Sequence, residues 1–320
     1  MAGKEKNTSD IQCQQGTVIR STGSWYDILT TDNNVYKGRL RGKFKIKGIK
    51  ATNPIAVGDN VSFFAEDTEE NTVVINSIED RENYIIRQST HKKGHKHIIA
   101  ANLDQAVLIA TISMPRTSLG FIDRFLVSCE SFHVPACIIF NKADLLNEEE
   151  KNYLAYLNQL YSNLEYKVLS VSALFDEALS KVSTLLKGKT SLVAGHSGVG
   201  KSTLINRLVP SALQRTAEVS NFAKKGVHTT TYAEMFKMDE ASFLIDTPGI
   251  KEFGILGLEE YEVSYFFPEI RDISESCKYY NCTHTHEPGC AVVDAVNEEE
   301  VAVSRYRSYL SILENEDNRR

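Results

Sequence analysis

The chain has 320 residues and a formal net charge of -6 at pH 7, a length that ordinarily corresponds to two or three domains. Apolar residues make up 42% and charged residues 24%, which is typical of a globular protein, and the net charge argues against a protein that is basic throughout. A local basic patch for nucleic acid is compatible with this balance. The N-terminal segment lacks the apolar core of a secretory signal, and no apolar run approaches the roughly 20 residues of a membrane span. We therefore expect a cytoplasmic protein without membrane contact, whose six cysteines are not paired in disulfides.

Short segments of β character occupy the N-terminal region, from about residue 12 to residue 83. Segments such as GTVIR, WYDILT and TVVINSI alternate with Gly, Asn, Asp and Pro, and no long helical period interrupts them. Short strands separated by turn residues are typical of a small barrel or sandwich. We therefore predict an OB-like β-barrel over residues 1–85.

A dense run of basic residues, without an acidic residue between its members, lies within this predicted barrel. Most members alternate at the period of a strand, so they can line one face. Such a stripe in a chain of net negative charge indicates a phosphate backbone as partner, although a charge run is more often a solvated face. The predicted RNA-binding residues are Lys37, Arg39, Arg41, Lys43, Lys45 and Lys47. Nearby aromatic residues can stack on bases, although such residues more often belong to a core: Trp25, Tyr26, Tyr36 and Phe44.

Apolar strands and amphipathic helices alternate over residues 86–252. The runs QAVLIATI, VPACIIFN, YKVLSVSA, TSLVAG and SFLIDTPG are separated by helical stretches such as EEEKNYLAYLNQLY and GKSTLINRLV. Continuous apolar strands between amphipathic helices indicate a parallel sheet that is covered on both faces. We therefore predict an α/β domain, whose ligand binds beyond the carboxyl ends of the strands.

Two short motifs after strands of this domain are suited to reading a guanine base. The sequence N-K-A-D supplies Asn141, Lys142 and Asp144, and the Asp144 carboxylate can accept hydrogen bonds from the guanine N1–H and exocyclic amine. Adenine offers no such pair of donors. The sequence S-A-L supplies Ser172 and Ala173, and the Ala173 N–H can donate to guanine O6. The first motif alone is weak, and its position after an apolar strand makes it informative.

A phosphate-binding loop follows the strand TSLVA and opens the helix STLINRLV. It fits G-x-x-x-x-G-K-[ST] at every fixed position, in the strand–loop–helix context that the motif requires. Its backbone N–H groups and the helix N-terminus favour an anion, a lysine reaches the β and γ phosphates, and a serine binds Mg²⁺. The residues that we assign to it are Gly195, His196, Ser197, Gly198, Val199, Gly200, Lys201, Ser202 and Thr203.

The sequence D-T-P-G follows a later strand and completes the predicted phosphate site. We predict that Asp246 holds Mg²⁺ through water and that the Gly249 N–H meets the γ phosphate. A run of threonines lies between the two phosphate motifs, and we favour Thr230 over Thr229 as the residue that closes over Mg²⁺. These threonines also suit the start of a strand. The predicted magnesium residues are Ser202, Thr230 and Asp246.

The residue after D-T-P-G is Ile250, where Ras-type switches have the glutamine that orients the attacking water. Because isoleucine cannot form that hydrogen bond, we expect slow intrinsic hydrolysis unless another group substitutes. His228 is the best candidate, since it adjoins the switch threonines and its pKa near neutrality suits polarising water. A solvated loop histidine is the alternative, and Gln214 is a weaker catalytic candidate.

Three of the six cysteines lie close together in the C-terminal region, which we expect to be a mainly helical module over residues 253–320. Cys277, Cys282 and Cys290, together with one histidine, provide a Cys₃His ligand set of the closed, structural zinc type. The spacing alone allows either His284 or His286 as the fourth ligand.

The motifs occur in circularly permuted order, because N-K-A-D and S-A-L precede the phosphate loop and D-T-P-G. The same sheet can form if the chain is cut at one surface loop and rejoined at another. With GHSGVGKS, DTPG, the upstream barrel and C-x4-C-x-H-x5-C, nearly the whole chain resembles the bacterial ribosome small-subunit-dependent GTPase A family. That resemblance implies a GTPase, with Mg²⁺ and one structural zinc, that binds the small ribosomal subunit and its rRNA late in assembly. It implies release after hydrolysis to GDP, and it favours His228 as catalytic and His284 as zinc ligand. We also expect a monomer.

Two other classes of function compete with this interpretation. The first is a P-loop ATPase or kinase, and the presence of both N-K-A-D and S-A-L argues against it. An RNA-binding assembly factor that uses nucleotide only for structure is compatible with Ile250. A nucleotide competition assay distinguishes a GTPase from an ATPase or kinase. Measurable GTP turnover in the presence of small subunits excludes a factor that uses nucleotide only for structure.

Overall fold

The computed structural model describes residues 13–40, 53–67, 71–88, 96–210, 212, 233–247 and 260–314. Its strands are β1 (Gln14–Ser21), β2 (Tyr26–Leu29), β3 (Val35–Leu40), β4 (Asn60–Asp67), β5 (Thr72–Ile78), β6 (Tyr84–Gln88), β7 (Lys96–Ala101), β8 (Gln105–Ala110), β9 (Ala136–Phe140), β10 (Lys167–Ser170), β11 (Thr190–Ala194), β12 (Glu234–Lys237) and β13 (Phe243–Asp246). Its helices are α1 (Leu119–Ser131), α2 (Glu148–Asn163), α3 (Asp176–Leu186), α4 (Lys201–Leu208), α6 (Pro268–Ser274), α7 (Ala291–Asn297) and α8 (Val303–Leu313), with 3-10 turns η1 (Ala143–Leu145) and η2 (Glu260–Phe266). Among these described helices, none has the length and apolarity of a bilayer span.

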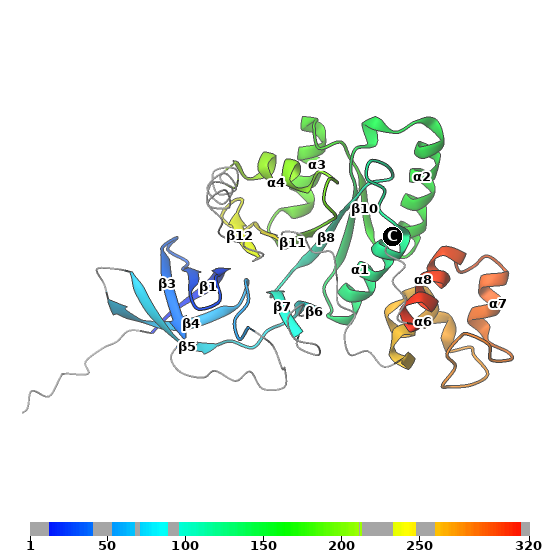
Figure 1. The fold of residues 1–320 in the computed structure, drawn as a ribbon, viewed down its shortest axis with the longest axis horizontal. Coiled ribbons are helices and arrows are strands. Elements are labelled where there is room, and N and C mark those ends of the chain that lie inside the picture. The colour runs from blue at the N-terminus through cyan, green and yellow to red at the C-terminus, as the bar shows by residue number, and fades with distance from the viewer. Residues whose placement is uncertain are drawn as a thin grey trace, which may run out of the picture.

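The N-terminal strands form a closed barrel, drawn in blue in Figure 1. The pairing order is β1-β2-β3-β5-β4, and an additional β1–β4 pairing closes the ring. Alternate residues of the strands point inward, and the core includes Val18, Ile28, Phe63 and Ile75, each fully buried. The predicted OB-like barrel is therefore confirmed as a β-barrel.

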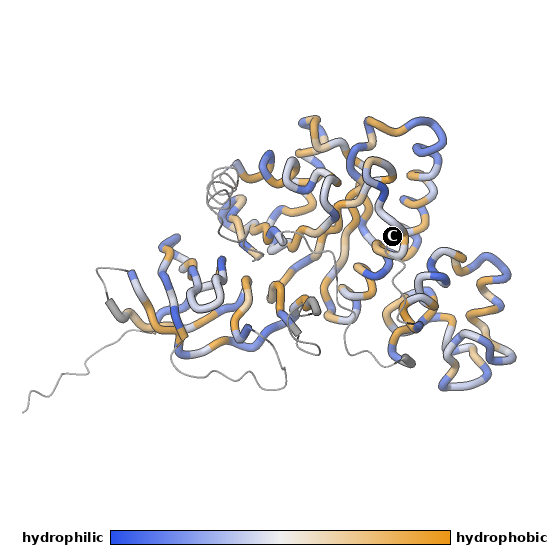
Figure 2. Tube along the Cα trace, in the orientation of Figure 1, coloured by the Kyte–Doolittle hydropathy of each residue, from blue (hydrophilic) through white to orange (hydrophobic). Residues whose placement is uncertain are grey.

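The central sheet is parallel in the order β10-β9-β8-β11-β13, with β12 antiparallel at its edge. Every residue of β8 is buried, as expected for a strand with helices on both faces. Leu108 packs in the core with residues of α1 and α2, whereas its neighbour Ile109 packs in the core with residues of α3 and α4. Figure 2 shows the same arrangement as hydrophobic residues concentrated along the central strands. The predicted α/β domain with a doubly covered sheet is confirmed.

The barrel and the central sheet are joined edge to edge. β1 of the barrel pairs with β12, with Arg20 opposite Glu234, so that one 11-stranded sheet runs through both (Figure 1). Ile19 on β1 and Val57, in the segment before β4, belong to the same hydrophobic core as the strands of the central sheet. A buried ion pair between Arg81 and Asp59, 2.6 Å apart, fixes the chain where it leaves the barrel.

The C-terminal region is a helical module that packs beside α1 (Figure 1). Its apolar core contains residues of η2, α6, α7 and α8, and it also takes in Val127 from α1. The expectation of a mainly helical C-terminal module is confirmed for the described residues.

A buried network of charges lies at the contact between α1 and this module. The Arg305 guanidinium on α8 donates to Asp123 on α1 at 2.8 Å and to Glu269 on α6 at 2.6 Å, and all three side chains are less than a tenth exposed. Tyr161 and Ser308 also donate to Asp123, at 2.9 and 2.5 Å. Burial raises the pKa of Asp123, and the contacts with Arg305, Ser308 and Tyr161 oppose this rise.

We expect Arg305→Met to destabilise the protein by about 3–5 kcal/mol, because it leaves two buried carboxyl groups without their cation. The measurement is urea unfolding followed by circular dichroism. Lys151→Met is the matched control, since Lys151 pairs with Glu148 in solvent and its loss should cost less than about 1 kcal/mol. Equal stabilities of the two variants would contradict this account of the interface.

Candidate guanine nucleotide site and metal cluster

The phosphate loop connects β11 to α4 with a backbone that favours glycine at three positions. Gly195 has φ 156°, Gly198 has φ 87° and Gly200 has φ 95°, in the region that side chains disfavour. A Cβ atom on Gly200 would lie 2.2 Å from the amide nitrogen of Asn141, and one on Gly195 would lie 2.6 Å from the Ile109 carbonyl oxygen. The glycines therefore permit the close approach of this loop to β8 and to the N-K-A-D loop.

The phosphate loop and the D-T-P-G motif meet at the carboxyl ends of two neighbouring strands. Val193 on β11 is in register with Asp246 on β13, and the Lys201 ammonium forms an ion pair with Asp246. Ser202 and Thr203 are exposed in the first turn of α4. The lysine predicted to hold phosphates and two of the predicted magnesium residues thus lie close together. A nucleotide with Mg²⁺ would replace the ion pair by contacts of both side chains with the ligand.

The Asn141 side chain links three loops that are far apart in the sequence. Its amide nitrogen donates to the Val199 carbonyl of the phosphate loop at 2.8 Å, and its amide oxygen accepts from the Ala173 N–H at 2.9 Å. Asn141 is buried, with 3% of its surface exposed, so both hydrogen bonds are shielded from water. The base-reading and phosphate-binding motifs are therefore parts of one site.

The other base-reading residues lie around Asn141. Lys142 has a left-handed backbone conformation, with φ 63°, and its ammonium donates to the Met114 carbonyl at 2.7 Å. Asp144 is exposed, which is compatible with the predicted reading of a base, and Ser172 is buried in the loop after β10. The Ala173 N–H, which we predicted to donate to guanine O6, here donates to Asn141 instead.

The loop after β8 lies against the phosphate loop, a contact that no motif in the sequence indicated. A Cβ atom on Gly198 would lie 3.3 Å from the Cδ atom of Pro115. The rings of His196 and Phe121 are 3.8 Å apart between centroids, and burial lowers the pKa of His196. His196 is therefore neutral at neutral pH and packs as a flat apolar surface, while Ser197 stays exposed and Val199 is fully buried.

Several predicted residues fall outside the described part of the chain. They include the catalytic candidates His228 and Gln214, and Ile250 after D-T-P-G. They also include Thr230, its alternative Thr229, and Gly249. Their roles remain predictions.

The basic stripe is described only in β3. Lys37 and Arg39 are both exposed and lie two residues apart on one face of the barrel, as the alternation predicted. The Arg39 guanidinium lies 6.0 Å from the ring of Trp25, which is 42% exposed. Tyr26 and Tyr36 pack in or against the barrel core, so of these three aromatic residues only Trp25 offers a surface for stacking. The remaining members, Arg41, Lys43, Lys45 and Lys47, and also Phe44, lie outside the described residues.

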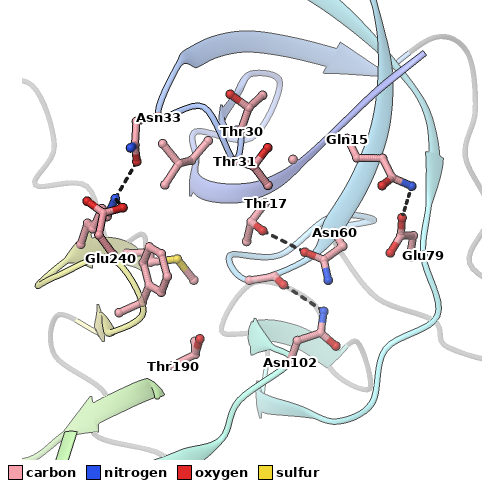
Figure 3. A pocket seen from close by; sticks show the side chains of 16 residues that line it. Gln15, Thr17, Thr30, Thr31, Asn33, Asn60, Glu79, Asn102, Thr190 and Glu240 are labelled. Carbon is pink, nitrogen blue, oxygen red and sulfur yellow. Dashed lines mark hydrogen bonds and ion pairs between the residues drawn. The ribbon is translucent and has the colours of Figure 1, made fainter. Parts of the chain in front are cut away.

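A polar cavity of about 560 Å³ lies apart from this site, between the barrel and the β12–β13 hairpin (Figure 3). Its wall includes Thr17, which donates to Asn60, and Lys237, which donates to Asn33. None of the described nucleotide motif residues lines it. The polar side chains in its wall are largely engaged with one another, so the cavity is a gap at the domain junction.

The C-terminal cysteines and one histidine form a compact cluster. One potential ligand atom from each of Cys277, Cys282, His284 and Cys290 lies within 4.8 Å of the other three. His286 is exposed instead, and its ring nitrogen contacts the Thr285 hydroxyl at 2.8 Å. The Cys₃His cluster can hold one metal ion, and the geometry places His284 rather than His286 in it.

Neighbouring side chains hold the loop of this cluster in place. The hydroxyls of Tyr306 and Tyr309 on α8 donate to the carbonyls of His284 and Thr283, at 2.7 and 2.8 Å. Burial raises the pKa of the Cys282 thiol to about 12. A bound dication is therefore needed to hold Cys282 as the thiolate that a metal requires.

A parallel sheet with these loops at its carboxyl edge, in this order along the chain, defines a circularly permuted P-loop GTPase. The RsgA GTPase family model matches residues 78–256, and the RsgA N-terminal domain model matches residues 15–73. The chain belongs to the RsgA GTPase family.

Individual relatives agree along nearly the whole chain. The small ribosomal subunit biogenesis GTPase RsgA 2 of Bacteroides thetaiotaomicron is 48% identical over 303 residues, which cover 95% of this chain and 97% of that protein. The RsgA of Bacteroides fragilis is 50% identical with the same coverage. The crystal structure of YjeQ from Thermotoga maritima superposes with a TM-score of 0.76 at 31% identity, covering 97% of this chain and 100% of that one. That of YloQ, described as a circularly permuted GTPase, gives 0.73 at 28% identity, covering 98% and 99%.

We expect His284→Ala to lose the bound metal, because His284 supplies one of the ligand atoms of the cluster. His286→Ala is the matched control and should retain one metal ion per chain, since its side chain points to Thr285. The measurement is metal content by mass spectrometry, together with the thermal midpoint, which should fall only for His284→Ala. Loss of the metal from His286→Ala alone would show that the ligand set is wrong.

Proposed function

We propose that this GTPase acts in the late assembly of the small ribosomal subunit, binding the subunit and its rRNA with GTP and leaving after hydrolysis. The observation that carries the proposal is the single site in which Asn141 joins the base-reading and phosphate loops. The names of the relatives from Bacteroides thetaiotaomicron and Bacteroides fragilis, which refer to small ribosomal subunit biogenesis, support the choice of substrate particle.

In the proposed cycle the chain's own residues bind and orient the nucleotide. Asp144 accepts from the guanine edge, Lys201 leaves Asp246 to contact the β and γ phosphates, and Ser202 contributes its hydroxyl. Ser202, Asp246 and Thr230 would hold Mg²⁺, which would supply positive charge to stabilise the phosphates during hydrolysis. The Gly249 N–H contacts the γ phosphate.

We assign the orientation of the attacking water to His228. The support is its position between the phosphate loop and D-T-P-G, together with Ile250 at the place of the usual glutamine. Residues of the subunit would then complete the site by fixing the segment that carries His228.

The barrel supplies the proposed contact with rRNA. Lys37 and Arg39 project from one face of β3 beside the exposed Trp25, which combines phosphate contacts with a surface for stacking. The stripe continues in the sequence with Arg41, Lys43, Lys45 and Lys47. We assign this face to the rRNA backbone.

Zinc is the metal that we assign to the cluster of Cys277, Cys282, His284 and Cys290. Three thiolates and one imidazole suit zinc, and four protein ligands leave no position for substrate, so its role is structural. We further propose domain limits of 1–85, 86–252 and 253–320, a monomeric protein, and a cytoplasmic location.

GTP turnover with and without purified small ribosomal subunits tests this function. We expect slow turnover alone and stimulation of at least tenfold by the subunits, at fixed salt, with GTP competed by GDP and not by ATP. Competition by ATP would indicate an ATPase or kinase instead. Nucleotide binding without stimulated turnover would indicate a factor that uses nucleotide for structure.

The same assay tests the assignment of His228. His228→Ala should reduce the stimulated rate by about 100-fold, the lower range for a group that assists proton transfer, while leaving GDP affinity unchanged. Gln214→Ala serves as the control for the weaker candidate and should keep the stimulated rate. An unchanged rate in His228→Ala would exclude this histidine.

A further inference from the structure

The carboxylate of Glu287 lies next to the metal cluster without being one of its four ligand residues. Both of its oxygens accept hydrogen bonds from the loop that precedes it. One oxygen accepts from the N–H and the hydroxyl of Thr283, at 2.8 and 2.6 Å. The other accepts from the N–H groups of Thr285 and His286, at 3.1 and 3.2 Å. These donors lie on both sides of His284 in the chain, so one carboxylate holds the backbone around that ligand.

The backbone of His284 has a conformation that needs this support. Its φ is 54°, in the left-handed region that residues with a side chain seldom adopt. His284 is buried, with 3% of its surface exposed, whereas His286 is exposed. The four hydrogen bonds to Glu287 fix the turn that places one histidine inside the module and leaves the other outside.

The same turn brings one particular nitrogen of His284 to the thiols. Its Nδ1 atom lies 3.5 Å from the Sγ atom of Cys277 and 3.5 Å from that of Cys290, and these two sulfurs lie 4.0 Å apart. Such separations suit ligand atoms around one tetrahedral ion with bonds of about 2.0–2.3 Å. The Tyr306 hydroxyl donates to the His284 carbonyl, so the loop is held from the side of α8 as well.

We propose that Glu287 is a positioning residue for the metal cluster, which holds the loop so that Nδ1 of His284, and not His286, completes the ligand set. Residues that hydrogen-bond around a metal ligand fix its orientation and contribute to metal affinity. A carboxylate suits this role, because its two oxygens can accept all four bonds and its charge strengthens each of them. The inference goes beyond the proposed zinc assignment and rests on it.

The test compares Glu287→Gln with the matched control Glu300→Gln. Glutamine keeps the length of the side chain at residue 287, but one oxygen becomes an amide group that can only donate, so the bonds to that oxygen are lost. Glu300 is exposed in the same module, and its replacement removes the same charge without altering the loop around His284.

Affinity for Co²⁺ is the measurement, because bound cobalt reports its thiolate ligands by charge-transfer absorption, and a competing chelator sets the free concentration. We expect Glu287→Gln to bind Co²⁺ about tenfold more weakly, at the lower end of the effect of such a residue. In a His284→Ala background the same change should cost less than about twofold, because no imidazole is left to position. Glu300→Gln should bind Co²⁺ as the unmodified protein does.

Hydrogen exchange of the metal-free proteins supplies an independent readout. The amides of residues 283–286 should exchange faster in Glu287→Gln than in the unmodified protein or in Glu300→Gln, because the loop loses part of its restraint before any metal binds. This comparison decides the question if His284→Ala binds too little cobalt to be measured.

Three outcomes would overturn the proposal. An equal loss of affinity with and without the His284 imidazole would mean that Glu287 supports the module as a whole, and unchanged affinity or unchanged exchange would exclude its role. If Glu287→Gln does not fold, Thr283→Val removes only the hydroxyl bond, and its smaller loss should depend on His284 in the same way; an equal loss in both backgrounds would again overturn the proposal. An unmodified protein that binds neither Co²⁺ nor Zn²⁺ would instead refute the metal assignment itself.

Discussion

The two hydrogen bonds of the buried Asn141 amide are the constraint on which the nucleotide site depends. They join the loop after β9, the loop after β10 and the loop before α4, which lie far apart in the sequence. An unpaired amide at a position only 3% exposed would be costly, so the three loops are held in one arrangement. Gly200 makes this possible, because any side chain there would occupy the place of the Asn141 amide. Circular permutation leaves this arrangement intact, since it depends on which strands are adjacent and not on the order of the chain.

The N-terminal barrel and the C-terminal helical module both contact elements that lie next to these loops. The C-terminal module is fixed to α1 through Arg305 and Asp123, and the same helix carries Phe121, which packs on His196 of the phosphate loop. The barrel is attached to β12 by the pairing of Arg20 with Glu234. β12 pairs in turn with β13, the strand that leads to D-T-P-G. The proposed rRNA-binding and metal-binding parts therefore both contact the nucleotide domain through short, direct connections.

The fold class could be predicted from the sequence, because apolar runs indicate the strands of the sheet and the motifs mark the carboxyl ends of those strands. Contacts between elements that share no motif could not be predicted in this way. In the sequence alone, Arg305 and Asp123 look like surface charges, and only the packing of α8 on α1 buries them. The spacing alone did not separate His284 from His286; the resemblance favoured His284, and the geometry brings its ring to the three thiols.

Hydrogen exchange of the nucleotide-free protein tests the central claim most directly. In an Asn141→Ala variant, the amides of residues 172–174 and of residues 195–200 should both exchange faster than in the unmodified protein, because one side chain restrains both loops. Asn158→Ala, which removes a hydrogen bond between α2 and β10, should leave the amides of residues 195–200 unchanged. Faster exchange in only one of the two loops, or in neither, would contradict the view that Asn141 makes them a single site.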